Sequence, residues 1–290
     1  MRTVVLLFAA LMMSQSPALA QDKKSNIVVI GAHPDDCDIK AGGIALLFSG
    51  MGHNVLFISV TNGDAGHHEM GGGALAKRRM KEAEEAGRRF GVKYVVLDNH
   101  DGELMPTLNI RHEIIRWIRR WNADVVISHR PNDYHPDHRN SSILVQDAAY
   151  MVIVPNVAPD TPPLAKNPVF LYMEDRFQRP NPFRADISVD ISSVLDKKYY
   201  AMAAHDSQFF EWLPWTAGRL GEVPSGSEAR LQWLKGSRRF EISPVVRENL
   251  RKWYGAQKAD AMTAAEAFEI CEYGRKPSDD EIKVLFPMLK

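Results

Sequence analysis

Apolar runs and amphipathic segments alternate along the first half of the chain. Mostly aliphatic runs at residues 27–30, 54–60, 92–97 and 124–128 predict strands that are buried on both faces of a sheet. Between them, residues 39–51, 75–90 and 108–121 repeat their apolar positions with the spacing of helices. Strands that alternate with helices of this length form right-handed βαβ units. The pattern therefore predicts an α/β fold: a Rossmann-like, three-layer parallel sheet with helices on both faces.

The second half of the chain is less regular. A proline-rich passage at 155–168 precedes a predicted strand at 169–173, and residues 190–205 have the pattern of a strand end that leads into a helix. From residue 206 to residue 290 the pattern favours short helices and loops rich in tryptophan. We therefore expect a main domain over residues 21–205 and an irregular, mostly helical C-terminal extension, 206–290, packed on the same domain.

Residues 1–20 have the pattern of a secretory signal peptide. Arg2 precedes an apolar stretch at 4–13, and small residues at 18 and 20 fit a cleavage site before Gln21. We expect export to the bacterial periplasm or beyond it. No other run approaches eighteen apolar residues, so we expect no membrane insertion of the mature chain. Cys37 and Cys271 could pair in an oxidising compartment, but the sequence does not show whether they approach each other.

The chain carries 36 basic and 36 acidic side chains, and this balance gives no electrostatic reason to expect a nucleic-acid partner. Its chemistry gathers instead after two of the predicted strands, in the segments IGAHPDD at 30–36 and HPDH at 135–138. Open α/β sheets bind their ligands at the carboxyl ends of strands. Imidazoles and carboxylates suit zinc or another borderline divalent cation. Each motif alone also fits helix N-caps and polar loop residues. Two of them at equivalent strand ends favour a metal site.

The residue types also suit amide hydrolysis. Three protein ligands leave one coordination position of a metal open for water, whose pKa zinc lowers to about 7. Adjacent residues in an extended turn point in opposite directions, so we expect only one of Asp35 and Asp36 to bind the metal. The other would stand beside the water as a general base. The spacing does not say which residue has which role.

The two motifs resemble those of the PIG-L (LmbE-like) superfamily of zinc-dependent deacetylases, which remove acetyl groups from N-acetylglucosamine units of glycolipids and small glycosides. The resemblance spans about residues 26–150. It implies that His33, Asp36 and His138 are the ligands of Zn²⁺ or another divalent metal. After HPDD the family usually has Glu, whereas this chain has Cys37. We interpret Cys37 as a small residue packed at a helix start.

The same resemblance implies catalytic roles. Asp35 becomes the general base and His135 the electrophilic or acid group, while Asp137 orients or tunes His135. A neighbouring carboxylate would favour the protonated imidazolium form of His135.

Two further positions are similar to substrate-binding residues of the family. Arg79 corresponds to an arginine that contacts substrate, with Arg78 an equally good candidate by spacing. Asp101 corresponds to an acid near the sugar pocket. Residues 61–73 contain five glycines and have the composition of a mobile lid. His53, His112 and His205 lack a partner pattern, and we interpret them as ordinary surface or helix residues.

The leading functional prediction is therefore an exported, metal-dependent deacetylase of an N-acetylglucosamine-containing small molecule or glycan. Alternatives are an amidase that acts on a larger non-sugar amide and a non-catalytic sugar-binding or nucleotide-binding relative. The first strand-to-helix turn lacks G-x-G-x-x-G, which disfavours nucleotide binding. Few basic residues lie near the motifs, which disfavours phosphoester hydrolysis. Trp212 and Trp215 are candidates for stacking on a sugar, although tryptophan more often fills a core.

Overall fold

A computed structural model describes residues 24–289 of the chain, and the predicted signal peptide lies outside this range. The described residues contain one seven-stranded sheet, in the order β3-β2-β1-β4-β5-β7-β6. The strands are β1 (Asn26–Gly31), β2 (Asn54–Ser59), β3 (Lys93–Val96), β4 (Val125–Ser128), β5 (Val169–Met173), β6 (Ile187–Asp190) and β7 (Ala265–Gly274). Strands β1 to β5 are mutually parallel, and β7 is antiparallel to both of its neighbours. The predicted α/β fold with a mostly parallel sheet is confirmed.

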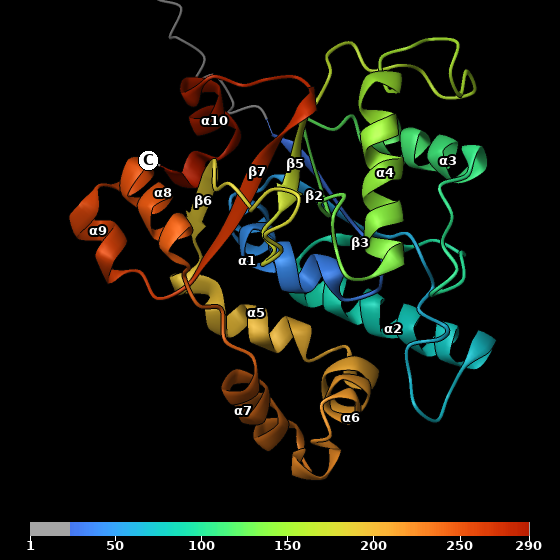
Figure 1. The fold of residues 1–290 in the computed structure, drawn as a ribbon, viewed down its shortest axis with the longest axis vertical. Helices are drawn as coiled ribbons and strands as arrows, with labels where there is room; N and C mark the ends of the chain where they lie inside the picture. The colour runs from blue at the N-terminus through green and yellow to red at the C-terminus, as the bar shows by residue number, and fades with distance from the viewer. Residues whose placement is uncertain (1–23, 290) are drawn as a thin grey trace, which may run out of the picture.

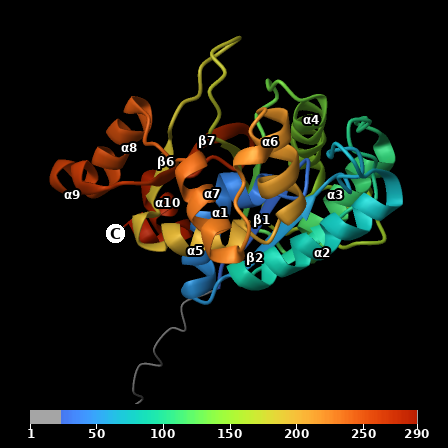
Figure 2. The ribbon, with the colours of Figure 1, turned by 90° about the horizontal axis from the view of Figure 1, so that it is seen from below.

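Helices cover both faces of the sheet (Figures 1 and 2). The five helices that flank the main strands are α1 (Asp36–Gly50), α2 (Gly72–Phe90), α3 (Leu108–Arg120), α4 (Pro136–Met151) and α5 (Leu195–Met202). The remaining helices are α6 (Leu213–Thr216), α7 (Ser227–Ser237), α8 (Pro244–Tyr254), α9 (Ala256–Ala261) and α10 (Asp279–Leu285). A π-helical turn at Gln208–Trp212 leads into α6, and 3₁₀ turns lie at Ser192–Val194, Leu220–Glu222 and Pro287–Leu289.

The alternation of side chains along β1 builds the three layers. Ile27 and Val29 pack into one core with residues of α1, α2 and α5. Val28 and Ile30 point to the other face and pack with residues of α3 and α4. All four are fully buried. This explains why the β1 sequence is continuously apolar, as expected for a central strand of a parallel sheet.

The C-terminal extension differs from its prediction. Residues 265–274 form β7, the longest strand in the described range, which lies between β5 and β6. The extension is mostly helical, as predicted, but it also supplies this strand, which completes the sheet of the main domain. The two cysteines are separate buried thiols without a disulfide. None of the helices in the described range is long and apolar enough to span a bilayer.

A buried ion pair ties β7 to the helices beneath it. The carboxylate of Glu266 lies 2.6 Å from the ammonium of Lys198, and both side chains are almost fully buried. Glu266 also accepts hydrogen bonds from the backbone N–H groups of Gly43 and Ile44 in α1. A Cβ on Gly43 would lie only 2.9 Å from the carboxylate, so glycine permits this approach. The helix that carries Asp36 is thus fixed to the C-terminal strand.

Candidate metal centre

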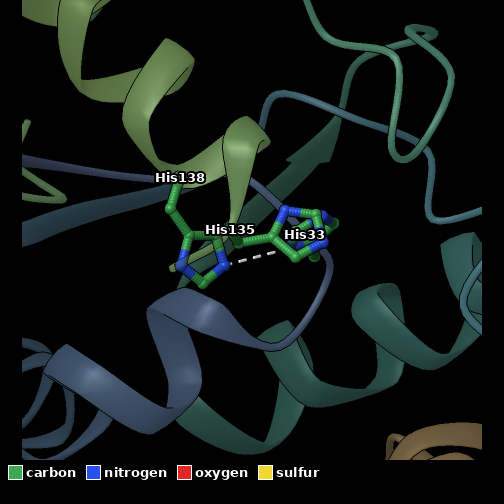
Figure 3. Close-up of side chains that lie close together, drawn as sticks. All are labelled: His33, His135 and His138. Atoms are coloured by element: carbon green, nitrogen blue, oxygen red, sulfur yellow. Dashed lines mark hydrogen bonds between the residues drawn. The ribbon is translucent and has the colours of Figure 1, made fainter. Parts of the chain in front are cut away.

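Two strand-to-helix turns bring the predicted ligands together. His33 and Asp36 lie where β1 turns into α1, and His138 lies in the first turn of α4, which follows β4. Because β1 and β4 are parallel neighbours, their carboxyl ends meet at one edge of the sheet. In Figure 3 the rings of His33, His135 and His138 gather at this edge, and a dashed line joins the rings of His138 and His33. His33, Asp36 and His138 are buried, whereas His135 is half-buried.

The spacing of the donor atoms fits a metal ion. His33 Nδ1 lies 3.2 Å from His138 Nε2 and 3.4 Å from Asp36 Oδ2, and His138 Nε2 lies 3.4 Å from Asp36 Oδ1. With metal–ligand bonds of about 2.0–2.1 Å, the ligands of a tetrahedral zinc ion stand roughly 3.3 Å apart. The three side chains therefore already have the separation that a tetrahedral cation requires.

The outer nitrogens of both imidazoles are held by carboxylates. His33 Nε2 lies 3.0 Å from Asp101 and 3.3 Å from Asp137, and His138 Nδ1 lies 3.0 Å from Asp133. Such bonds place the protons on the outer nitrogens and leave the inner nitrogens free to bind a metal. Burial alone would lower the pKa of each imidazole, yet the surrounding carboxylates raise both pKa values. The charge of the site therefore favours a cation.

His129, which directly follows β4, is a candidate site residue that the sequence motifs do not indicate. Its ring stacks on His138 with centroids 4.1 Å apart, and its Nε2 lies 3.3 Å from Asp36. The predicted ligands are divided among three groups of donors spaced closely enough to hold a metal ion. These are His33, His135 and His138; Asp36, His129 and His138; and His33, Asp101 and Asp137. His129 Nε2 also accepts a hydrogen bond from the Ala32 backbone N–H, so its lone pair is already engaged. The signal that could have found His129 is its position at the strand end.

Asp35 and Asp36 diverge, as the sequence predicts for adjacent residues. Asp36 faces the imidazoles, whereas the Asp35 carboxylate lies 3.5 Å from the guanidinium of Arg79. Asp35 has φ 155°, a conformation that costs energy in a non-glycine residue and that clusters at functional sites. Burial raises the pKa of the Asp35 carboxyl to about 6, although Arg79 acts in the opposite direction. A carboxylate with this pKa can take and return a proton near neutral pH.

Arg79 is the arginine that faces the site. Its side chain is buried, donates to the Pro34 carbonyl and lines the same cavity as the metal ligands. The loop residue Gly63 packs directly against this side chain. Its φ is +70°, and a Cβ there would lie 2.7 Å from the Arg79 guanidinium, so only glycine permits this close contact. Arg78 points away and pairs with Glu211.

His135 differs from its predicted electrostatic setting. Its ring caps the N-terminus of α4, because its Nδ1 accepts a hydrogen bond from the Asp137 backbone N–H. In the neutral ring the proton therefore lies on Nε2. Burial lowers the pKa of His135, and the neighbouring rings of His33 and His138 lower it further, although Asp137 acts in the opposite direction. The expectation that Asp137 keeps His135 protonated is thus not supported.

The side chain of Asp137 has another position than predicted. Its carboxylate contacts His33 and accepts hydrogen bonds from the backbone N–H groups of Gly102 and Leu104. These donors, together with the His33 ring, outweigh the effect of burial and lower the pKa of Asp137. The Asp137 carboxylate therefore lies against His33, and only the backbone N–H of Asp137 bonds the ring of His135. Asp101 likewise contacts His33, although it also lines the cavity.

The ligands open onto a cavity of about 540 Å³. One wall comes from the C-terminal extension through Gln208, Trp212 and Arg238, and another from the loop after β5 through Arg176 and Phe177. Trp212 thus reaches the cavity, as the sequence suggested for a sugar-stacking residue.

The glycine-rich segment 61–73 packs on this wall through a column of stacked rings. Successive ring centroids are 4.6, 5.3 and 5.3 Å apart along the column of His67, His68, Trp215 and Trp212. His67 Nε2 lies 2.7 Å from Glu211, which joins the segment to the π-helical turn. The predicted lid therefore rests against the cavity, and its residues Ala65 and Gly66 line it.

Two other positions beside the ligands are structural. Cys37 is buried and donates to the carbonyls of Val29 and Ile58, as expected for a packed residue at the helix start. His205 was wrongly interpreted as an ordinary residue. It is fully buried, and its Nε2 lies 2.9 Å from Asp38 in α1, which also accepts from the Tyr94 hydroxyl. Its partner is 167 residues away, so no local spacing could reveal it.

Comparison with known proteins identifies a family model and several relatives of this chain. The family model described as "GlcNAc-PI de-N-acetylase" (PIG-L) matches residues 28–149. Diacetylchitobiose deacetylase of Thermococcus kodakarensis is 33% identical over 203 residues, which cover 65% of this chain and 73% of that protein. A 4-oxalmesaconate hydratase of Pseudomonas putida is 25% identical over 197 residues, 65% of this chain and 76% of the hydratase.

Among solved structures, the N,N'-diacetylchitobiose deacetylase from Pyrococcus horikoshii in complex with an inhibitor has the same fold. Its TM-score is 0.63 at 24% identity, and the alignment covers 84% of this chain and 83% of the other. The matched region of the family model contains both HPD motifs, whereas much of the C-terminal wall of the cavity lies beyond it.

Proposed function

Because the chain belongs to the PIG-L family, we propose that it hydrolyses the N-acetyl amide of an N-acetylglucosamine-containing glycoside. The observation that carries the proposal is a set of three side chains whose donor atoms lie 3.2–3.4 Å apart, with carboxylates behind both imidazoles and a cavity in front. An amidase that releases acetate needs both a metal centre and a general base such as Asp35. A protein that only binds sugar needs neither.

His33 Nδ1, Asp36 and His138 Nε2 would hold the cation, which we propose to be zinc or another borderline divalent metal. When bound, such a cation supplies a water of lowered pKa and polarises the amide carbonyl. Asp101, Asp137 and Asp133 keep the two imidazoles in the orientation and tautomer that bind it.

Asp35 is the proposed general base. It adjoins the ligands without joining them, and its raised pKa suits the uptake of a proton from the attacking water. The same carboxyl can then return the proton to the leaving amine. The guanidinium of Arg79 lies beside the Asp35 carboxylate and holds it in position. Its positive charge also lowers the pKa of Asp35, which favours the ionised form that a general base requires.

His135 is the proposed donor to the carbonyl oxygen. Because Nδ1 is engaged by the Asp137 backbone N–H, Nε2–H of the neutral ring is the group that is free to donate. Negative charge grows on the carbonyl oxygen as the water attacks, so a hydrogen bond from this group strengthens in the transition state.

We also propose that the mature chain acts after export, in the periplasm or outside the cell, on a small molecule or glycan. This rests on the signal-peptide pattern of residues 1–20 alone. A stacked column of aromatic rings beside the cavity supports a carbohydrate substrate, since rings bind the apolar faces of sugars.

The test is acetate release from a panel of N-acetylglucosamine compounds, measured with the mature protein before chelation, after chelation and after zinc is restored. We expect release that chelation abolishes and zinc restores. Asp35→Asn should lose this activity while it retains stoichiometric metal. Because a hydratase is among the relatives, an unsaturated dicarboxylic acid belongs in the panel. Hydration of that compound without acetate release from any amide would overturn the proposal.

A further inference from the structure

One acid in the wall of the cavity has an oxygen without a partner. Asp175 lies in the loop after β5 and lines the cavity in front of the candidate metal ligands. Its side chain is only 8% exposed, and its Oδ1 lies 2.9 Å from the Arg130 guanidinium. Its other oxygen, Oδ2, is buried and has no hydrogen-bond partner within residues 24–289. A buried carboxylate oxygen without a donor costs free energy, which a ligand that supplies the donor would recover.

The other acids that line this cavity are already engaged at the metal centre. Each contacts an imidazole or a guanidinium, and they are Asp35, Asp36, Asp101 and Asp133. Among the acids of the cavity wall in the described range, only Asp175 has a carboxylate oxygen that is both buried and unpartnered. This oxygen is therefore the acceptor that the proposed mechanism leaves unused.

Arg130 fixes the direction of the Asp175 carboxylate. Besides its contact with Oδ1, the guanidinium donates to the Asn181 carbonyl at 2.8 Å and lies 3.1 Å from the Glu269 carboxylate. The backbone N–H of Phe177 also donates to Oδ1. Both donors hold the same oxygen, so Oδ2 is a preorganised acceptor that binds a ligand at little cost in conformational entropy.

The charges around Asp175 favour a neutral donor over a cation. An ionised carboxylate only accepts hydrogen bonds, so the ligand must offer an N–H or O–H group. Arg130 already pairs with this carboxylate, and Lys40 and Arg238 line the same cavity, so a further cation would meet like charges. When the acetamido group of an amino sugar reaches the metal ligands, the ring hydroxyls are the neutral donors that remain.

We propose that Asp175 Oδ2 accepts a hydrogen bond from one hydroxyl of the sugar and thereby positions the acetamido group at the metal ligands. This deepens the deacetylase function proposed above and rests on it. Asp175 lies outside residues 28–149, the region that the family model matches, so the shared motifs do not supply this contact. The residue would determine specificity without taking part in amide cleavage.

The test compares methyl N-acetylglucosaminide with its 3-deoxy, 4-deoxy and 6-deoxy analogues. For the wild-type protein we expect at least one deletion to lower kcat/KM about 10- to 100-fold, because it leaves the Asp175 charge buried and unpaired. In Asp175→Ala the same deletion should change kcat/KM less than about threefold, since the two partners of one contact are not additive. The analogue whose effect disappears identifies the hydroxyl. Equal effects of every deletion in both proteins would overturn the contact.

Glu269→Gln is the matched control. Glu269 is the second carboxylate on Arg130, but it is not among the described residues that line the cavity. This variant should keep the wild-type preference, and loss of the preference here would show that Arg130, not Asp175, determines it. If Asp175→Ala fails to fold by circular dichroism, Asp175→Asn replaces it. The two donors on Oδ1 would orient the amide oxygen, so an NH₂ group would take the place of the acceptor and the preference should fall.

Dissociation constants from NMR titration of the same four glycosides separate this inference from the deacetylase function. If no glycoside releases acetate, the contact is still supported by an analogue that binds the wild type about tenfold or more weakly than its parent and binds Asp175→Ala as tightly as its parent. Equal binding of all four glycosides by the wild type, or binding of none, would refute the contact whatever the reaction.

Discussion

Substitutions of His135 can distinguish its proposed role as a hydrogen-bond donor to the substrate from its structural role as the N-cap of α4. In the structure its Nδ1 caps α4, and we propose that its Nε2–H donates to the carbonyl oxygen of a substrate. His135→Ala removes both functions. His135→Asn removes the imidazole but keeps a side chain that ranks among the best N-caps. The two variants together therefore distinguish catalysis from helix stability.

The magnitudes follow from these contacts. Loss of one oxyanion donor lowers kcat about 10²- to 10³-fold, and His135→Ala should show the full loss. His135→Asn should lose no more than this, because its amide N–H is itself a hydrogen-bond donor. Loss of the cap costs about 1 kcal/mol, and only in His135→Ala. For a chain of this size that corresponds to a decrease in Tm of about 2–4 °C. Metal content should stay stoichiometric in both, because His33, Asp36 and His138 hold their spacing without His135.

Three measurements check this division: single-turnover rates of acetate release, thermal unfolding and metal content by elemental analysis. Full activity in His135→Ala would refute the donor role. Loss of metal from His135→Asn would show instead that His135 is a ligand, as its place in one of the donor groups allows.

Other parts of the structure make separate predictions. Asp133→Ala should weaken metal binding about 10- to 100-fold in competition with a chelating dye, because its carboxylate contacts a candidate ligand imidazole, His138; Asp147→Ala, at an exposed position of the helix that carries His138, should not. Glu266→Gln should lower the free energy of unfolding in denaturant by about 3–5 kcal/mol, since it leaves the Lys198 ammonium buried and unpaired, and a loss below 1 kcal/mol would contradict this. The pKa of His205 is raised by its buried carboxylate partner, which outweighs burial, so the stability advantage of wild type over His205→Gln should be complete below pH 6.5, the ordinary pKa, and shrink as pH rises above it. A pH-independent difference in unfolding free energy would count against that pairing.

The sequence predicts the main sheet and the metal motifs because both depend on local patterns. The aliphatic runs of β1, β2 and β4 and the two HPD segments are short, and their chemistry needs no distant partner to be recognised. The two HPD segments lie close together because neighbouring parallel strands have their carboxyl ends at the same edge of the sheet. The carboxylates behind the imidazoles follow no such rule. Asp137 turns toward His33 because two loop N–H groups and an imidazole offer it hydrogen bonds there.

The strand β7 could not be predicted from the sequence, because its formation also depends on distant partners. Its sequence, AEAFEICEYG, contains three glutamates and two alanines, residue types that are depleted in strands. Glu266 is buried in this strand only because Lys198 and the backbone of α1 satisfy its carboxylate. Strand formation therefore depends on partners more than 60 residues away in the chain, which the local pattern does not contain.

The residues proposed to carry the reaction come from short sequence motifs, whereas the residues that would select the substrate come from other parts of the chain. The candidate ligands and Asp35 come from two short segments inside the region that the family model matches, and with a bound cation those segments would supply the groups that activate water. The outer cavity wall comes from the loop after β5 and from residues 208–213 and 238, all outside that region. Activated water can attack an amide or add to a double bond, so a family with one centre can contain deacetylases and a hydratase. Which reaction and which substrate a member selects must then depend on the wall, and in this chain the wall presents Trp212, Arg176 and Arg238.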